Sequence, residues 1–418
     1  MKLNTHYTAW GCTQIKKAIS CISILLIICS LVSIAPSIED SNVKANVSSN
    51  GQITYSAYGK EAVVLYNVEI SNADINFLAQ RFSLIDTLFD DGTSYILSKM
   101  LQIKAVNPNV KILGYKDFLG QQPTANDWTE VNKHEDYFAH DANGNRIRNS
   151  DWGWYLMDIS SLGWRQYLVS YINAHTNNGA YDGVFADDVW TVFWDVYKFD
   201  QTVPTSIKTN LKTDMLGLLQ YVKSNMLPGK VLFINTDDWT TQNYISASDG
   251  MMIEGYGHAA WESLDNPGSQ GISNILQQIN ALSLNSGNGK IVWANSGSTI
   301  SDFSDYVRIN KMIKNCFAYY LLAANGGGAY FGFECNNALS IYKSSAYLSV
   351  VQVPIGVPLG SYYTSQNTYM RNFTGGKVVV NLSDSIQTVY LDLSYKLIDG
   401  SSVTTLTLNP RNAEIILY

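Results

Sequence analysis

Eight short apolar segments that alternate with helix-like stretches constrain the fold of this chain more than any other feature. The strand-like segments are residues 62–66, 83–88, 111–115, 183–187, 231–234, 251–254, 290–294 and 328–333. The helix-like stretches are residues 73–81, 93–106, 164–175, 207–224, 240–246, 269–284 and 303–324. Strands that alternate with helices form a parallel sheet with the helices outside it. Eight such units predict an α/β fold, a (β/α)8 TIM barrel.

The pattern changes near the C-terminus, where strand-like segments follow one another without helices. They are residues 369–373, 377–382, 387–393, 403–408 and 413–418, and turn residues separate them. Short strands at this spacing are typical of an all-β module. We therefore predict two domains, a catalytic barrel over residues 55–350 and a small antiparallel β-sandwich over residues 354–418.

The first 45 residues have the pattern of a targeting segment. Lys16 and Lys17 precede an apolar run over residues 18–34, as in a secretory leader. The run is near the lower length limit of a membrane-spanning helix, so an uncleaved signal anchor is the alternative. We expect a leader over residues 1–45, a linker over residues 46–54, and a secreted or extracytoplasmic location. An uncleaved leader would attach the protein to the membrane.

Composition and motifs argue against several classes of partner and cofactor. The net charge is -7 and the sequence has no basic stripe, so we expect no nucleic-acid partner. No His-rich zinc motif is present, so we expect neither a metal nor a cofactor, although calcium at Asp187 and Asp188 stays an alternative. Beyond the leader, Cys316 and Cys335 are either buried thiols or a disulfide.

Two of the strand-like segments end in carboxylates. The fourth ends in Asp187, with Asp188 directly after it, and the sixth ends in Glu254. The carboxyl ends of barrel strands form the active-site face, so these acids should share one rim. A pair of carboxylates there is what glycoside hydrolysis requires. The alternatives are that Asp187 caps a helical turn and that Glu254 forms a buried salt bridge.

The two carboxylates are predicted to have different roles. Apolar surroundings would raise the pKa of Glu254 and suit a general acid/base, whereas polar neighbours would keep Asp187 ionised as a nucleophile or stabilising carboxylate. Because their strands are two apart, the backbones should stand on the order of 10 Å from each other. A carboxylate separation of roughly 5–5.5 Å would imply a covalent intermediate, and roughly 6.5–9.5 Å an attacking water.

Other residues at the strand ends are predicted to contact the substrate. Asp188 either orients Asp187 or points outward, and the amides of Asn235 and Asn295 either bind sugar hydroxyls or cap loops. Asp86 and Glu334 also fall at strand ends. The connection over residues 118–163 should wall one side of the cleft or pack on itself. The remaining predicted substrate contacts are Lys116 and Asp117, with Tyr66, Tyr115, Trp190 and Tyr256 as subsite walls or plain core residues.

At this point the chain resembles a known group of glycoside-hydrolase-like barrels related to the endo-α-1,4-polygalactosaminidases. The resemblance rests on Asp-Gly-Val-Phe-Ala-Asp-Asp at residues 182–188, Leu-Met-Asp-Ile-Ser at residues 156–160, Trp-Arg-Gln-Tyr-Leu at residues 164–168, and Arg-Asn-Phe-Thr-Gly-Gly-Lys-Val-Val-Val-Asn at residues 371–381. It implies catalytic carboxylates after strands four and six, which fall on Asp187 and Glu254. The acid doublet departs from the single acid usual in that group and leaves the role of Asp188 open.

These observations favour an exported glycosidase that cleaves a polysaccharide or glycoconjugate. The alternative is a non-catalytic carbohydrate-binding or cell-surface protein built on the same barrel. A glycan esterase or deacetylase is a third interpretation, but no G-x-S-x-G motif supports it.

Overall fold

The computed structural model describes residues 60–66, 68–89, 94–264, 271–299, 305–334 and 339–418. The predicted leader, the predicted linker and Cys335 lie outside these ranges. Of the helices in the described part, none combines the length and the hydrophobicity needed to cross a membrane.

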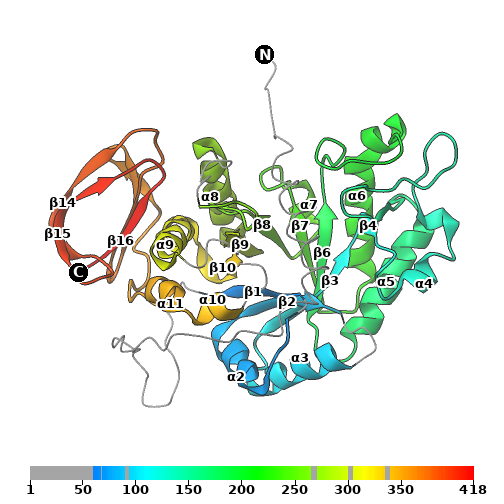
Figure 1. The fold of residues 1–418 in the computed structure, drawn as a ribbon, viewed down its shortest axis with the longest axis horizontal. Helices are drawn as coiled ribbons and strands as arrows, with labels where there is room; N and C mark the ends of the chain where they lie inside the picture. The colour runs from blue at the N-terminus through cyan, green and yellow to red at the C-terminus, as the bar shows by residue number, and fades with distance from the viewer. Residues whose placement is uncertain (1–59, 67, 90–93, 265–270, 300–304, 335–338) are drawn as a thin grey trace.

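The core of the molecule is a parallel barrel of eight strands (Figure 1). The strands pair in chain order, and Glu61, directly before the first strand, bridges Phe331 of the last, so the sheet closes on itself. This confirms the predicted (β/α)8 architecture. The strands are β1 (Ala62–Leu65), β2 (Leu84–Leu88), β3 (Lys111–Asp117), β6 (Gly183–Val189), β7 (Val231–Thr236), β8 (Gly250–Glu254), β9 (Ile291–Gly297) and β10 (Ala329–Glu334).

Helices cover the outside of the barrel. Some begin with local capping: at the first of them Ser71 accepts a hydrogen bond from the Asp74 backbone, and the Asp74 carboxylate bonds back to the Ser71 backbone. The prediction of a helix over residues 240–246 is only partly right, because a single turn forms there. The helices are α2 (Asn72–Arg81), α3 (Tyr95–Val106), α5 (Leu162–Thr176), α6 (Thr205–Asn225), α7 (Asn243–Ser246), α8 (Ile272–Gly287) and α9 (Tyr306–Ala323).

The barrel has two apolar layers because side chains alternate between the two faces of each strand. Outward side chains pack beneath the helices in one large cluster. Inward side chains form a separate cluster that fills the barrel, so the interior is solid at this level. That inner cluster consists of Ala62, Val64, Leu84, Leu113, Phe185, Val231, Phe233, Met252, Trp293 and Tyr330.

The long connection between β3 and α5 forms ordered structure of its own. It contains β4 (Gly120–Gln121), α4 (Trp128–Val131), the 3-10 turn η1 (Glu135–Tyr137) and β5 (Tyr155–Leu156). A turn forms over residues 141–145, where His140 bridges Arg146 across it and Gly144 takes a φ of 82°. Trp128 stacks on Tyr155 with ring centroids 5.7 Å apart, so much of this connection packs on itself.

After β10 the chain forms two short helices and an antiparallel sheet of six strands. The helices are α10 (Leu339–Lys343) and α11 (Ser345–Val351). The strands are β11 (Tyr363–Ser365), β12 (Thr368–Phe373), β13 (Gly376–Val380), β14 (Gln387–Lys396), β15 (Ser402–Leu408) and β16 (Ala413–Leu417), in the order β11-β12-β13-β16-β14-β15. Both short helices and β11 are additions that the sequence pattern did not indicate.

The C-terminal module has two layers made from one sheet. β14 joins β16 through a single residue pair, Lys396 with Leu417, so the β14–β15 hairpin folds over the other four strands. Val379 and Val389 meet in the apolar cluster between the layers, whereas the neighbouring Val378 belongs to the core of the barrel side. This alternation explains how one sheet forms the predicted sandwich.

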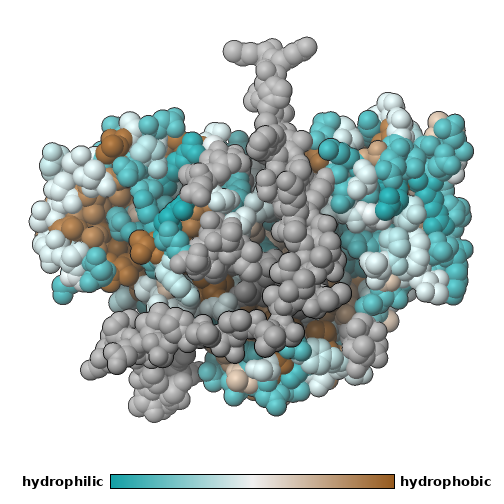
Figure 2. Space-filling model, viewed as in Figure 1, coloured by the Kyte–Doolittle hydropathy of each residue, from teal (hydrophilic) through white to brown (hydrophobic). Residues whose placement is uncertain are grey.

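The module packs against α9, which lies between it and the barrel (Figure 1). The guanidinium group of Arg371 on β12 donates hydrogen bonds to the carbonyls of Leu321, Leu322 and Ala324 at the end of α9. Those carbonyls have no partner within the helix, so Arg371 both caps α9 and fixes the module. Figure 2 shows hydrophobic surface at the outer, β14–β15 end, where Tyr390 and Leu393 are exposed.

Candidate active site

A polar layer lies on top of the apolar filling at the C-terminal end of the barrel. Every second side chain of a barrel strand points inward, and the last inward side chain of several strands is polar. On β6 the inward Phe185 is followed two residues later by Asp187, and on β8 the inward Met252 is followed by Glu254. We call this set the mouth layer. Its members are Tyr66, Asp86, Tyr115, Asp117, Asp187, Asn235, Glu254, Asn295 and Glu334.

Asn235 on β7 joins the two predicted catalytic carboxylates. Its amide nitrogen donates to Asp187 Oδ1 and to Glu254 Oε2, each at 3.0 Å. The two acceptor oxygens therefore cannot be farther apart than twice that distance. Since the two N–H bonds of a planar amide diverge, the oxygens lie roughly 5 Å apart. This spacing is close to the roughly 5–5.5 Å of retaining glycosidases and shorter than the roughly 6.5–9.5 Å of inverting ones.

Asp187 accepts a hydrogen bond on each carboxylate oxygen. Tyr115 donates its hydroxyl to Oδ2 at 2.8 Å, and Asn235 donates to Oδ1. Asp187 lies within β6 and does not cap a helix. Two donors that fix both oxygens orient the carboxylate, as attack by one of its oxygens requires.

Glu254 ends β8 in a more apolar setting. Burial, with a further contribution from the negative charge of Asp187, raises its pKa to about 8. The hydrogen bond from Asn235 opposes this rise but does not cancel it. Glu254 therefore carries a proton at neutral pH, as a general acid must. It forms no salt bridge with any residue that the structure describes.

Asp188 turns away from the strand direction and is buried. Its φ of 56° lies in the left-handed region, and the pairing of β6 with β7 is interrupted between Ala186 and Val189. This local bulge lets two successive acids both reach the mouth. Asp188 Oδ1 accepts hydrogen bonds from Trp190 Nε1 at 2.6 Å and from the Tyr197 hydroxyl at 2.7 Å.

The carboxyl group of Asp117 lies near that of Asp188, and neighbouring negative charges of the site contribute to the raised pKa of each. Asp117 Oδ1 accepts from the backbone nitrogens of Leu119 and Gly120 at 2.9 and 2.6 Å. Burial and the charge of Asp187 raise the pKa of Asp188 to about 7. Burial and the neighbouring acids raise the pKa of Asp117 well above its usual range. The two carboxyl groups lie beside Asp187.

Two further pairs line the part of the mouth formed by β1, β2, β9 and β10. Tyr66 donates its hydroxyl to Asp86 Oδ2, and Asn295 donates to Glu334 Oε2 at 3.2 Å. Burial raises the pKa of Asp86 well above its usual range and also raises that of Glu334. Asp86 and Glu334 thus add two carboxyl groups to the site.

The site is acidic. None of its six carboxyl groups forms an ion pair with a lysine or arginine that the structure describes. Among the described residues, no three His, Cys, Asp or Glu side chains are grouped so as to hold a metal ion. The six are Asp86, Asp117, Asp187, Asp188, Glu254 and Glu334.

Two residues predicted to bind substrate lie outside the site. Lys116 points away from the mouth because it alternates with Tyr115 and Asp117 on β3. Its ammonium group is buried and bonds Gln121 and Asp127, each at 2.7 Å, which fastens the long connection to the barrel.

Tyr256 is the second correction. Its side chain is fully buried in the helix-side core, and its hydroxyl donates to the Tyr319 carbonyl at 3.0 Å. Beside it Cys316 is a free thiol, and burial raises the pKa of this thiol to about 12. The other predicted contacts, including Trp190, lie in or beside the mouth layer.

Three residues of the site were not among the predicted substrate contacts. Asp86 and Glu334 fall at strand ends, and strict two-residue alternation would have placed both side chains inside the barrel. Tyr197 lies in the loop after β6, and the sequence carries no signal that it reaches Asp188.

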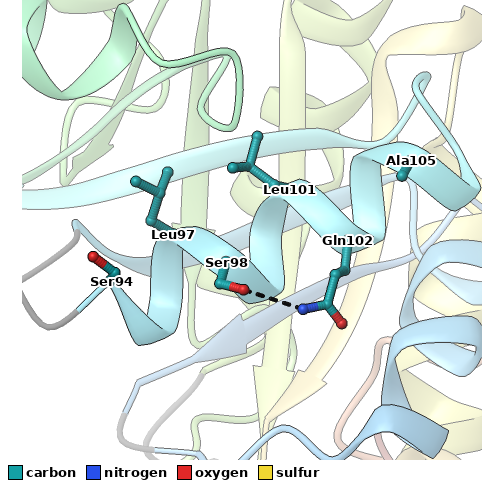
Figure 3. A pocket seen from close by; sticks show the side chains of 6 residues that line it. All are labelled: Ser94, Leu97, Ser98, Leu101, Gln102 and Ala105. Atoms are coloured by element: carbon teal, nitrogen blue, oxygen red, sulfur yellow. Dashed lines mark hydrogen bonds between the residues drawn. The ribbon is translucent and has the colours of Figure 1, made fainter.

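A separate surface hollow lies along α3 and is lined by that helix alone (Figure 3). Apart from Gln102 its side chains are small or aliphatic, and the Gln102 amide donates a hydrogen bond to the Ser98 hydroxyl at 3.1 Å. It holds neither a carboxylate nor an aromatic ring, so it lacks the groups that bind and cleave a sugar. The lining residues are Ser94, Leu97, Ser98, Leu101, Gln102 and Ala105.

An eight-stranded barrel with carboxyl groups gathered at its mouth is the arrangement of a glycoside hydrolase. The chain belongs to the hypothetical glycosyl hydrolase family 15 (GHL15), whose model matches residues 104–377. This confirms the family resemblance that the sequence motifs indicated. No curated protein matches the chain.

Several solved glycoside hydrolases are similar in structure. The noncanonic maltogenic α-amylase AmyB from Thermotoga neapolitana has a TM-score of 0.52 and 11% identity, covering 86% of this chain and 97% of that one. The glycoside hydrolase domain of PelA from Pseudomonas aeruginosa has a TM-score of 0.45 and 14% identity, covering 67% and 96%. Ega3 from Aspergillus fumigatus, solved with galactosamine, has a TM-score of 0.41 and 15% identity, covering 68% and 93%. At such identities the likeness to AmyB shows the fold.

Proposed function

We propose that this protein is an exported, retaining glycosidase in which Asp187 is the nucleophile and Glu254 is the general acid/base. The observation that carries the proposal is the amide of Asn235, which holds the two carboxylates at the spacing of a double-displacement mechanism. The hydrogen bonds to both oxygens of Asp187 and the raised pKa of Glu254 support the same division of roles.

In the first step an oxygen of Asp187 attacks the anomeric carbon while the bond to the leaving oxygen breaks. Glu254 gives its proton to that oxygen, so the leaving sugar departs as a neutral alcohol. In the second step the ionised Glu254 takes a proton from water, and the water oxygen displaces Asp187 from the anomeric carbon. Tyr115 and Asn235 hold the Asp187 carboxylate in line through both steps.

The charge of the mouth supports a cationic glycan as the substrate. None of the six carboxyl groups pairs with a lysine or arginine that the structure describes, so a positively charged ligand would favour their ionised forms and be held by them. A sugar with a free amino group carries such a charge at neutral pH. The sequence resemblance to the polygalactosaminidase group points in the same direction. We therefore propose a polymer that contains unacetylated amino sugar.

Export is the remaining part of the proposal, and it rests on the leader pattern of residues 1–45. Fractionation of the source cells tests it. Recovery of full-length protein from the cytoplasm would contradict export, and recovery of uncleaved protein from the membrane would identify the leader as an anchor.

Release of reducing ends from a glycan panel tests the activity. The panel contains chitosan, de-N-acetylated polygalactosamine, their acetylated forms, starch and dextran. We expect cleavage of a de-N-acetylated polymer, and a loss of about 10³-fold or more in Asp187→Asn and in Glu254→Gln, because each removes a group that acts in the transition state. Asp237→Asn is the control, since both oxygens of this rim carboxylate bond only Thr191 among the described residues. Binding of a glycan without cleavage would support the carbohydrate-binding alternative.

A further inference from the structure

Three polar side chains of the mouth layer have no part in the proposed bond cleavage. Asp86, Asn295 and Glu334 come from β2, β9 and β10. Asp86 is fully buried and Asn295 is 2% exposed. Asp86 uses Oδ2 to accept from Tyr66, and Asn295 uses Nδ2 to donate to Glu334.

Each of the first two has a polar atom left over. No residue that the structure describes provides a hydrogen-bond partner for Asp86 Oδ1 or for Asn295 Oδ1. Buried polar atoms in folded proteins are almost always paired, and leaving one unpaired costs stability. Two such atoms in one corner of an active-site mouth mark a surface that is complementary to a polar ligand.

This corner lies next to the catalytic pair. Asn295 is the register partner of Glu254 in the β8–β9 ladder, so the two residues lie side by side on adjacent strands. On the other side the Tyr66 ring packs edge-on against the Tyr115 ring, with centroids 5.1 Å apart, and Tyr115 bonds the nucleophile. A sugar ring that presents its anomeric carbon to Asp187 can therefore extend its other substituents toward this corner.

We propose that Asp86, Asn295 and Glu334 form a specificity wall, which binds hydroxyl or amino groups on the ring carbons remote from the scissile bond. This proposal rests on the proposed glycosidase function, since it names the recognition surface of the same site. Asn295 Oδ1 accepts a hydrogen bond from the sugar, and Asp86 and Glu334 either accept or donate according to their protonation. The wall selects the glycone by hydrogen bonding, and a glycone without the matching group leaves these buried atoms unpaired.

A cycle of enzyme and substrate changes tests the wall. The probes are 4-nitrophenyl glycosides of the glycone that the wild-type enzyme cleaves, together with the 3-deoxy, 4-deoxy and 6-deoxy analogues. In the wild type we expect one deoxygenation to lower kcat/KM by about 10²-fold or more. In Asp86→Asn or in Asn295→Ala the same deoxygenation should cost less than about threefold, because the protein partner is already missing. Asp237→Asn should keep the wild-type preference, and melting curves identify any variant that fails to fold.

The outcomes separate the wall from the glycosidase function. Two results overturn the proposed wall while the glycosidase function stands. In the first, the loss of kcat/KM from the substitution and the loss from the deoxygenation are additive. In the second, both variants cleave the parent glycoside with unchanged kcat/KM. If the wild type hydrolyses no glycan or glycoside, the wall is tested by sugar binding instead. Calorimetry measures the binding of galactosamine, glucosamine, galactose and glucose. Loss of binding in Asn295→Ala with retention in Asp187→Asn upholds the wall without catalysis. Equal binding to the wild type and Asn295→Ala, or no binding to either, overturns it.

Discussion

Carboxyl groups lie at both ends of the barrel strands, and the two sets differ in their partners. At the N-terminal end, acids directly before three strands meet a basic side chain from a neighbouring helix, and at the C-terminal end none of the six carboxyl groups does so. The three N-terminal pairs are Glu61 with Arg81, Asp182 with Lys104, and Asp249 with Lys223, at 2.6, 2.6 and 2.5 Å.

This difference separates acids that stabilise the fold from acids that serve the site. A buried carboxylate is unfavourable unless a cation or hydrogen-bond donors compensate for the lost hydration. At the N-terminal end Arg81 provides that compensation with a hydrogen bond from Nη2 to Glu61 and an ion pair between Nε and the same carboxylate. Burial raises the pKa of Glu61 as well, although Arg81 opposes the rise. At the mouth, where no lysine or arginine of the described residues pairs with the acids, burial raises the pKa values of Asp188 and Glu254 to about 7 and about 8. A buried carboxyl group with a pKa near neutrality can transfer protons, but its burial lowers the free energy of unfolding.

The largest effect on stability should follow from breaking an N-terminal pair. Arg81→Met leaves the fully buried Glu61 without its cation, so we expect a loss of about 3–5 kcal/mol in the free energy of unfolding. Asp86→Asn, an equally buried acid at the mouth, leaves no cation unpaired and should be neutral or stabilising. Urea unfolding of both variants measures the contrast. A small loss in Arg81→Met, or an equal loss in both, would remove the distinction between the two ends.

A smaller effect, of opposite sign, is expected for Glu254→Gln. Because the folded-state pKa of about 8 lies above the ordinary value of 4.5, the folded protein retains this proton between those pH values while the unfolded chain loses it. Stability from this group is therefore present at low pH and falls as the pH rises from about 4.5 to about 8. Glu254→Gln removes that slope and should raise the free energy of unfolding at pH 8 by at most about 4 kcal/mol, since each pKa unit corresponds to about 1.4 kcal/mol.

Melting temperatures of the wild type and Glu254→Gln from pH 5 to pH 8.5 provide the measurement. The difference between them should be small at the acidic end and should grow with pH. A difference that stays constant, or that shrinks as the pH rises, would mean that Glu254 is ionised at neutral pH and cannot be the general acid.

The smallest effect concerns the charge of Asp188. This charge helps to raise the pKa of Glu254, so Asp188→Asn should move the alkaline limb of kcat/KM to lower pH by roughly half a unit. Asparagine tolerates the left-handed backbone conformation at this position, which limits the loss of fold. An unchanged limb would show that Asp188 acts only through its contacts with Trp190 and Tyr197.

Much of the fold follows from the sequence, because strand and helix periods are strong signals in a repeating α/β chain. All eight predicted barrel strands are present, and the acids that end the fourth and sixth strands lie together as expected. The alternation of side chains along a strand also explains an error in the predicted site. Lys116 follows an inward Tyr115 and therefore points outward, so strict use of the two-residue period would have removed it from the predicted site.

Other parts of the site depend on contacts that no local pattern encodes. The approach of Asp188 to Asp117 requires a bulge in β6 and a left-handed backbone at position 188, which is neither a glycine nor an asparagine. Tyr256 follows directly after Gly255 in a loop, so the sequence alone did not distinguish a subsite wall from a core residue. Asn235 was a plausible loop cap until its amide was found between two carboxylates.

Trapping the covalent intermediate tests the central claim most directly. The wild-type enzyme is incubated with a 5-fluoro glycosyl fluoride of the sugar that it cleaves, then digested, and the peptide that contains β6 is sequenced by mass spectrometry. The account predicts one added glycosyl group on Asp187, and none in Asp187→Asn treated in the same way. Hydrolysis that gives a product of inverted configuration without any adduct, or an adduct on a residue other than Asp187, would contradict it.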